Sequence, residues 1–295
     1  MTFRREEGVD DDLDAGGFTG FLRSLLAGVP WSERAEGEEE LILEPPAGGV
    51  IKLHNANGRT RVYGEDRADV AVLVSKTARA ESAEAAARLL DEITVVSAER
   101  GDAVELEVEV PRKWNRRGWA NVEVRMPRAM QVELSAVNGR IEIQGVRGRV
   151  KARSSNGSAC ITNVVGDIEV TTSNARVCCS GTCGRLVARS SNGKIEVDGH
   201  HGSIDASTSN GLIRACLEEV GKQGVQLATS NGRIVLELPD EVDADVDIRV
   251  DNGVIRNDRS LCRASRETTG RLSGRLGSGG ALIKLRTSNG SVSLR

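Results

Sequence analysis

The dipeptide Asn-Gly returns along this chain at a fixed spacing, and this spacing constrains the fold more than any other feature. Asparagines recur every 18 residues over 138–210, then twice after 21 residues and once after 37 residues. They are Asn138, Asn156, Asn174, Asn192, Asn210, Asn231, Asn252 and Asn289. A regular period of about 20 residues is typical of stacked repeats, each of which is too small to bury a core alone.

One repeat predicts two strands and two turns. Apolar residues alternate with polar ones over 194–198 and again over 203–207, which is the pattern of strands with one apolar face. Asn192-Gly193 is expected to form one turn because both residues tolerate a positive φ, and 199–202 forms the other.

The apolar positions keep the same register from repeat to repeat. Three residues after the asparagines come Ile141, Ala159, Val177, Ile195, Ile213, Ile234, Ile255 and Val292. Similar apolar columns lie five, twelve and fourteen residues after the asparagines of the 18-residue repeats. We therefore predict an all-β fold, a single-stranded parallel β-solenoid or β-helix with rungs of 18–21 residues, one inserted helix and a short N-terminal amphipathic helix. An array of hairpins is the rival fold.

The chain divides into three predicted parts. Residues 1–40 form an acidic tail with an amphipathic helix over 18–29. Residues 41–135 form a diverged N-terminal β region with an alanine-rich helix over 78–92, and Asn57-Gly58 marks an early rung. Residues 136–295 form the regular solenoid, which an irregular loop over 258–280 interrupts.

The amphipathic helix is the candidate docking element. Its apolar side chains and the tryptophan that follows are Phe18, Phe21, Leu22, Leu25, Leu26 and Trp31. The helix could cap its own solenoid, bind a partner protein or lie on a membrane surface. Acidic residues flank the helix, which disfavours binding to anionic lipid. Peripheral membrane contact is therefore the weakest of these three alternatives.

Charge is distributed unevenly. Residues 1–50 carry 12 acidic and 4 basic side chains, whereas 256–295 carry 9 basic and 2 acidic ones. The basic end could attract nucleic acid, acidic glycan or the acidic tail of the same chain, but it lacks aromatic residues for base stacking. No signal peptide and no run of 18 apolar residues is visible, so a cytoplasmic location is expected.

The turn asparagines are the candidate structural ladder, because stacked asparagine side chains can hydrogen-bond along an edge. No catalytic residue, metal ligand set or cofactor is expected. Three of the six cysteines, Cys178, Cys179 and Cys183, cluster without a second half at metal spacing. Cys160 and Cys178 lie one repeat apart, which is within reach of a disulfide, and the sequence leaves open whether they pair.

Several segments carry a resemblance to a known family. Residues 122–127, Val137 to Ile141, Thr208 to Gly211 and Thr287 to Val292 resemble the bacterial putative-adhesin β-repeat family, a domain of unknown function. The segment 274–280 is similar to the closing loop of that family. The resemblance covers about residues 40–295, implies a β-solenoid and brings no catalytic residues with it.

Three functions remain open at this point. The first is a non-enzymatic, adhesin-like interaction scaffold, with a self-assembling variant built end to end like the bactofilin cytoskeleton. The second is a carbohydrate-active β-helix enzyme using outward acids such as Glu142, Glu169 and Glu196. The third is binding of an acidic polymer or nucleic acid by the basic end, for which the signal is weak.

Overall fold

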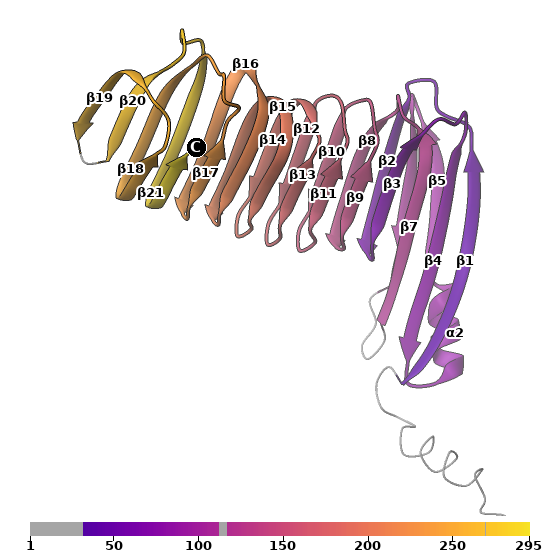
Figure 1. Ribbon diagram of the computed structural model, residues 1–295. Coiled ribbons are helices and arrows are strands. Elements are labelled where there is room, and N and C mark those ends of the chain that lie inside the picture. Colours follow the sequence, from indigo (N-terminus) through magenta and orange to yellow (C-terminus); the bar gives the residue numbers. More distant parts are fainter. Residues whose placement is uncertain (1–31, 112–116, 269) are drawn as a thin grey trace, which may run out of the picture.

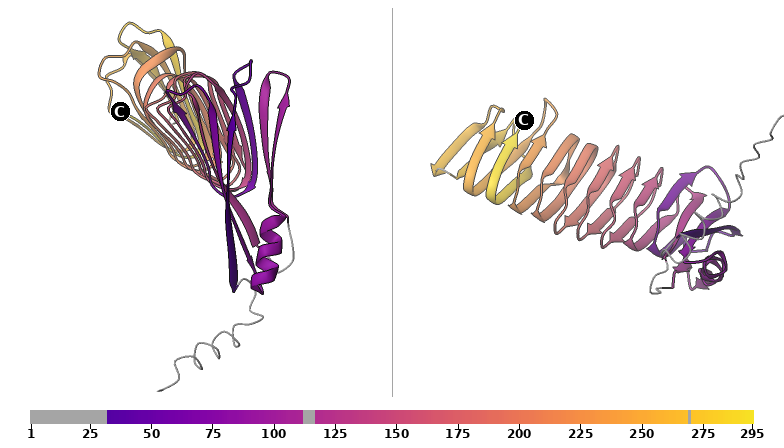
Figure 2. Two further views of the ribbon diagram at one scale, coloured as in Figure 1. Left: turned by 90° about the vertical axis from the view of Figure 1, so that its right-hand side faces the viewer. Right: turned by 90° about the horizontal axis from the view of Figure 1, so that it is seen from below.

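The structure is a computed structural model, and it describes residues 32–111, 117–268 and 270–295. Figure 1 shows a row of flattened coils, with a group of longer strands at the N-terminal end of the row. Seen along the row, the coils nearly superpose as narrow loops (Figure 2, left). The docking residues predicted at 18–31 lie outside the described residues.

The coils form two stacks of parallel strands. The first stack contains β9 (Ile141–Gln144), β11 (Ala159–Thr162), β13 (Val177–Ser180) and β17 (Ile234–Glu237). The second stack contains β8 (Gln131–Asn138), β10 (Val150–Ser154), β12 (Ile168–Thr172) and β14 (Cys183–Ser190). Each strand pairs in parallel with the strand one repeat away, as Ala159 pairs with both Ile141 and Val177. This parallel register confirms the predicted solenoid and excludes the hairpin array.

The apolar columns of the sequence fill the space between the stacks. Ile141, Ile143, Val150 and Ala152 are all buried, and their equivalents in the next coils are buried as well. A single hydrophobic cluster runs from Ile51 to Leu294. Because each coil contributes only a few aliphatic side chains, the core is thin and continuous, and neighbouring coils depend on one another.

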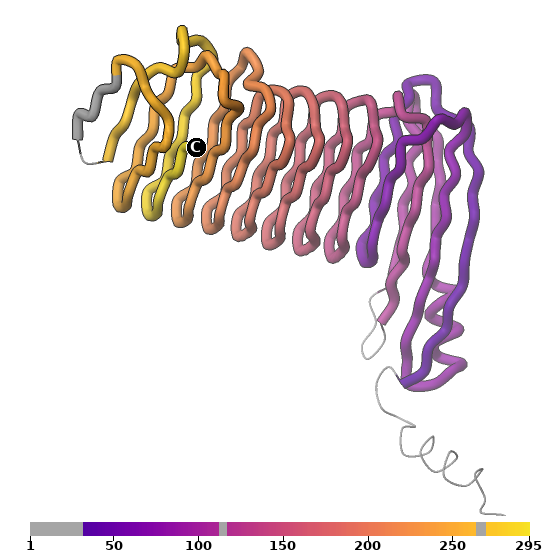
Figure 3. Tube along the Cα trace, in the orientation of Figure 1, coloured from indigo at the N-terminus to yellow at the C-terminus, as the bar shows by residue number. Residues whose placement is uncertain are grey.

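Toward the C-terminal end of the row, single strands run without a break from one stack into the other, and the chain trace in Figure 3 follows this path. They are β15 (Ile195–Asn210), β16 (Ile213–Asn231), β18 (Ala244–Asn257) and β21 (Ala281–Leu294). The C-terminal strand β21 lies between β16 and β18 in the second stack and between β17 and β18 in the first. Strand β18 is therefore the last of these strands in the row, although β21 follows it in the sequence.

The segment 258–280, predicted as an irregular loop, instead contains two strands. These are β19 (Cys262–Thr268) and β20 (Arg271–Leu276), and β20 pairs antiparallel with both β18 and β19. The antiparallel pairing supplies hydrogen bonds to the open edge of the second stack.

The N-terminal region adds one coil and a large insertion. Strands β2 (Val50–Asn57) and β3 (Thr60–Glu65) stack directly on β8 and β9, which confirms the early rung at Asn57-Gly58. The insertion contains β4 (Val70–Ala80), β5 (Thr94–Arg100), β6 (Ala103–Glu109) and β7 (Arg117–Pro127). Strand β7 extends the first stack beyond β3, and β6 extends the second stack beyond β2.

Two predicted boundaries need correction. Strand β1 (Glu33–Leu43) begins inside the predicted tail, because it pairs antiparallel with β4 along its whole length. The helix predicted at 78–92 is shorter: α2 spans Ala83–Asp91, because β4 continues to Ala80 and the Ser82 side chain caps the helix by accepting from the Ala85 N–H. The division at 135 stays a prediction, although the core itself is continuous.

Candidate functional site

The turn asparagines lie in one row at the edge of the stacks. In spatial order they are Asn57, Asn138, Asn156, Asn174, Asn192, Asn210, Asn231, Asn289 and Asn252. In this order, each asparagine after Asn57 donates from Nδ2 to the Oδ1 of the one before it over 2.9–3.1 Å. The structure thus brings together all eight asparagines singled out in the sequence, and it adds Asn57.

The glycines of the central turns are needed for a different reason from the one expected. In the central coils, Asn192 and Gly193 do not have a positive φ, whereas Gly58, Gly253 and Gly290 near the ends of the row do. A Cβ on Gly193 would instead overlap the carbonyl oxygen of Ala175 in the neighbouring coil, and a Cβ on Gly157 would overlap that of Gly139. Close stacking of the turns therefore excludes a side chain at Gly157 and Gly193. Left-handed backbone occurs at the opposite turn, at Gly145, Asn163, Gly181 and Gly199.

A hydroxyl column was missed in the sequence. Two residues before the asparagines come Ser154, Thr172, Ser190, Thr208, Thr229 and Thr287, and all six are buried. Thr208, for example, donates to the Gly193 carbonyl over 3.0 Å, and Thr287 donates to that of Gly232 over 3.2 Å. Ser or Thr at this offset in six of the eight repeats was the available signal; Ala136 and Val250 stand there in the other two. The column satisfies turn carbonyls, so its role is structural.

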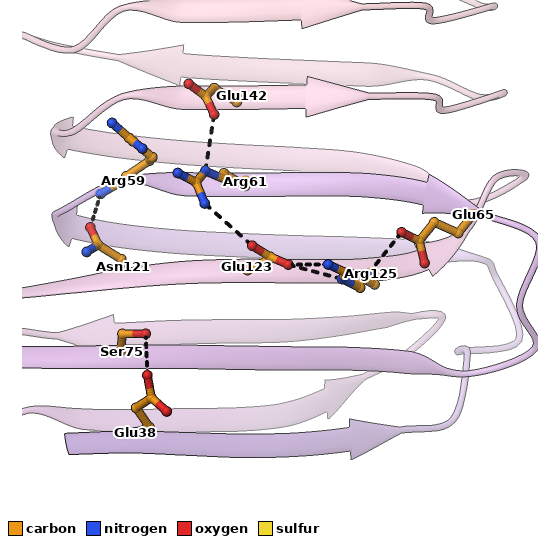
Figure 4. Close-up of polar contacts among 9 residues, drawn as sticks. All are labelled: Glu38, Arg59, Arg61, Glu65, Ser75, Asn121, Glu123, Arg125 and Glu142. Carbon is orange, nitrogen blue, oxygen red and sulfur yellow. Dashed lines mark hydrogen bonds and ion pairs between the residues drawn. The ribbon is translucent and has the colours of Figure 1, made fainter.

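Charged side chains gather on the outer face of the first stack where the insertion meets the coils (Figure 4). We call this cluster the ion-pair face. It consists of Arg59, Arg61, Glu65, Glu123, Arg125, Arg140 and Glu142. The parallel register places Glu123 of β7, Arg61 of β3 and Glu142 of β9 at one level on adjacent strands, so opposite charges alternate.

The pairs of the ion-pair face form one network. Arg61 lies 3.2 Å from Glu142 and 3.6 Å from Glu123, and Arg140 lies 2.8 Å from the second oxygen of Glu142. Arg125 lies 2.9 Å from Glu123 and 3.5 Å from Glu65. The hydrogen bond with Glu123 raises the pKa of Arg125 above its ordinary value. Each carboxylate of the network therefore has at least one guanidinium partner.

A cleft of about 540 Å³ opens beside this network. Arg59, Arg61, Leu73, Asn121 and Glu123 are among its lining residues. The Arg59 backbone N–H donates to Asn121 Oδ1 over 2.9 Å, which fixes the loop between β2 and β3. The Arg59 guanidinium is exposed and has no partner among the described residues, so it is free to pair with a ligand or partner.

The outward acids considered for catalysis are engaged in ion pairs. Glu169 pairs with Arg153 over 3.2 Å, Glu196 pairs with Lys194 and Arg176, and Asp205 pairs with Arg189. Within the described ranges, no three His, Cys, Asp or Glu side chains are grouped so as to hold a metal ion. The arrangement can therefore bind charged groups.

The cysteines behave as small core and surface residues. Cys160 and Cys178 form a disulfide between adjacent strands of the first stack, with Cα atoms 4.6 Å apart. Cys179 is buried, and the loss of hydration raises the pKa of its thiol to about 12. Cys183 is exposed.

Comparison with known proteins places the chain in a family. A family model matches residues 52–295, and its description is Toastrack DUF4097. The chain belongs to the Toastrack DUF4097 family. This match confirms the resemblance noted in the sequence. No curated protein matches the chain. Among the described residues, no helix combines the length and the apolar character that a membrane crossing requires.

The chain is also similar to solved structures of low identity. A "putative adhesin" from Parabacteroides merdae is 11% identical, with 90% of this chain and 97% of that chain covered and a TM-score of 0.47. A "putative adhesin" from Bacteroides fragilis is 9% identical, with 90% and 99% covered and a TM-score of 0.45. A "putative lipid binding protein" from Parabacteroides distasonis is 10% identical, with 88% and 96% covered and a TM-score of 0.35.

Proposed function

We propose that this Toastrack protein is a non-enzymatic, adhesin-like scaffold that binds a partner protein through the ion-pair face. The observation that carries the proposal is the alternation of Glu123, Arg61 and Glu142 on adjacent strands beside a cleft. A surface of mixed sign suits a protein partner with complementary charges, because a simple polyanion would be repelled by the glutamates. Such complementarity gives specificity and a faster association rate.

Arg59 gives the sharpest test of this proposal. It is exposed and unpaired among the described residues, so Arg59→Glu reverses one charge at the cleft without breaking an ion pair. Arg185→Glu is the matched control, because Arg185 is an exposed arginine of the second stack that also has no described partner. We expect one protein captured by the full-length wild-type chain to be lost with Arg59→Glu and retained with Arg185→Glu. Equal capture by all three chains would overturn the assignment of this face.

The alternative of a carbohydrate-active enzyme is tested separately. The full-length chain is incubated with pectin, alginate and hyaluronate, and newly formed reducing ends are measured. We expect none, because the outward carboxylates are neutralised by arginines and lysines. Cleavage of any of these polymers that disappears in Glu196→Gln would replace the scaffold proposal with a carbohydrate-active enzyme.

End-to-end self-assembly is a second candidate, and the strand edges favour it. In the described part of the chain, residues 254–257 of β18 pair only with β21, and Val254 is 56% exposed. At the other end, β1 pairs only with β4 among the described strands and carries five glutamates, whereas the C-terminal segment 256–295 is rich in basic residues. An open edge can pair with another strand.

Light scattering on the full-length chain decides between the two candidates. A mass that rises with protein concentration and falls in Ile255→Pro would support assembly through the β18 edge. A constant monomer mass over the same range would leave the partner-binding scaffold. Proline is the suitable substitution because it removes an N–H that faces the open edge: Asp258 N–H donates to Leu294 of β21, and successive N–H groups of a strand point to opposite sides, so that of Ile255 points away from β21.

A further inference from the structure

A second cleft lies on the outer face of the second stack near the C-terminal end of the row. Its volume is about 520 Å³. Its polar lining includes Ser207, Ser209, Ser230, Ser288, Arg249, Arg286 and Asp251. We call it the serine–arginine cleft. Its strands β15, β16, β21 and β18 are adjacent only because β21 inserts between β16 and β18.

Arg249 and Arg286 stand side by side in the lining of this cleft, and Arg271 lies next to Arg249 outside the lining. The register aligns Arg286 of β21 with Arg249 of β18, and Arg249 with Arg271 of β20. Like charges directly opposite one another on paired strands are destabilising. This alignment of like charges lowers the stability of the fold. A local arrangement that lowers stability is typical of a binding site.

The carboxylate of Asp247 lies near all three arginines. Asp247 lies 3.4 Å from Arg249, 3.6 Å from Arg286 and 3.8 Å from Arg271. These separations exceed the roughly 2.8 Å of a good charge-assisted hydrogen bond. The Nε atoms of Arg249 and Arg286 are buried and have no hydrogen-bond partner among the described residues. The guanidinium groups of Arg249 and Arg286 thus keep donor capacity in reserve.

Hydroxyl groups complete the lining beside the arginines. The register places Ser209, Ser230 and Ser288 in one row on adjacent strands, and no partner is found for these hydroxyls among the described residues. Ala228 lies between Ser207 and Arg286, and its small side chain keeps the floor open. The lining contains no aromatic residue, so stacking on a sugar ring or base is not available at this cleft.

We infer that the serine–arginine cleft binds a tetrahedral oxyanion, a phosphate or sulfate group, through Arg249, Arg286 and the hydroxyls of Ser209, Ser230 and Ser288. Guanidinium forks match the oxygens of such groups, and serine hydroxyls donate to the oxygens that remain. Asp251 lies at the end of the serine row and weakens the site by repulsion. The inference extends the proposed binding role to a different surface, and the ion-pair face could bind its partner even if this cleft stayed empty.

The test is a calorimetric titration of the full-length chain with inorganic phosphate and, separately, with inorganic sulfate, at constant ionic strength. We expect Arg286→Ala to weaken binding by about tenfold or more, as for the loss of a charge-assisted hydrogen bond. Arg185→Ala removes the same charge from the same stack outside the cleft, and should change affinity by less than about twofold. Equal weakening by both variants would mean general charge attraction and overturn the site.

Ser230→Ala keeps the proposal testable if Arg286→Ala fails to fold. The Ser230 hydroxyl is exposed and has no described partner, so its removal should leave the fold intact and weaken anion binding by about fivefold. Asp251→Asn should tighten binding. Unchanged affinity in both variants, or no binding of either anion by the wild type, would overturn the inference. Preferential binding of one anion identifies a phosphate or a sulfate ester as the source, and capture of a protein through Arg59 is read out independently.

Discussion

The ion-pair face and the serine–arginine cleft are built in the same way, from outward columns on stacked strands, but they balance charge differently. On the ion-pair face, Arg61 lies between Glu123 and Glu142, so its guanidinium meets a carboxylate on each neighbouring strand. At the cleft, Arg249, Arg286 and Arg271 share Asp247. The solenoid fixes where outward side chains stand, while the residue type in each column decides whether that surface is neutralised or left available.

A substitution that disrupts the stacked coils between the two regions should have the largest effect on the free energy of unfolding. A side chain at Gly157 would overlap the Gly139 carbonyl, so Gly157→Val should cost about 3 kcal/mol of unfolding free energy, as overpacking does. Urea unfolding followed by circular dichroism measures this loss. Ala175→Gly in the same column is the control and should change stability by less than about 1 kcal/mol. A similar small change for Gly157→Val would show that the turns are not tightly stacked.

The asparagine ladder is the next link between the two regions. Asn174 donates to Asn156 and accepts from Asn192, so Asn174→Ala should remove two hydrogen bonds and cost about 2 kcal/mol in urea unfolding. Ser173→Ala changes the neighbouring turn residue, whose hydroxyl has no described partner, and should be nearly neutral. Equal effects of the two variants would mean that the ladder contributes no stability of its own.

The repeat spacing was enough to predict the coils, because both the core columns and the asparagine row follow from residues at a fixed offset. The order of the last coils could not be predicted. Asn289 lies between Asn231 and Asn252 in the row. The repeat spacing assigns each residue to a column, but it does not say which coil lies next to which. Both charged regions depend on such neighbours: Arg61 meets Glu123 across the insertion, and Arg286 meets Arg249 because β21 inserts.

Acid should loosen the cleft before the ion-pair face. His200 is buried in β15, the strand that also carries Ser207 and Ser209, and burial lowers the pKa of His200 below its ordinary value. Below about pH 6.5 the unfolded chain therefore binds more protons than the folded chain. Stability is retained above that pH and is lost as pH falls, by at most about 1.4 kcal/mol per unit. Hydrogen exchange should speed up in β15 more than in β3.

A double variant isolates this histidine. Thr182 Oγ1 lies 2.8 Å from His200 Nδ1, and earlier coils have the buried Val146 and Val164 in the same column. Thr182→Val with His200→Val removes both polar partners and should flatten the acid dependence. His201→Gln, at the neighbouring half-exposed position, should retain it. An unchanged slope in the double variant would assign the acid sensitivity to other groups.

The substitution with the smallest expected effect on stability should make the ion-pair face more like the serine–arginine cleft in charge. Glu123 is the carboxylate shared by Arg61 and Arg125, so Glu123→Gln leaves both guanidiniums with fewer opposing charges. The loss of partly exposed ion pairs should cost less than about 1 kcal/mol. The variant should nevertheless bind inorganic phosphate at the ion-pair face, which calorimetry compares with wild type in an Arg286→Ala background. Glu169→Gln, on the second stack, is the matched control. If Glu123→Gln gains no anion binding, excess guanidinium charge alone is insufficient, and the serine hydroxyls of the C-terminal cleft carry the selectivity.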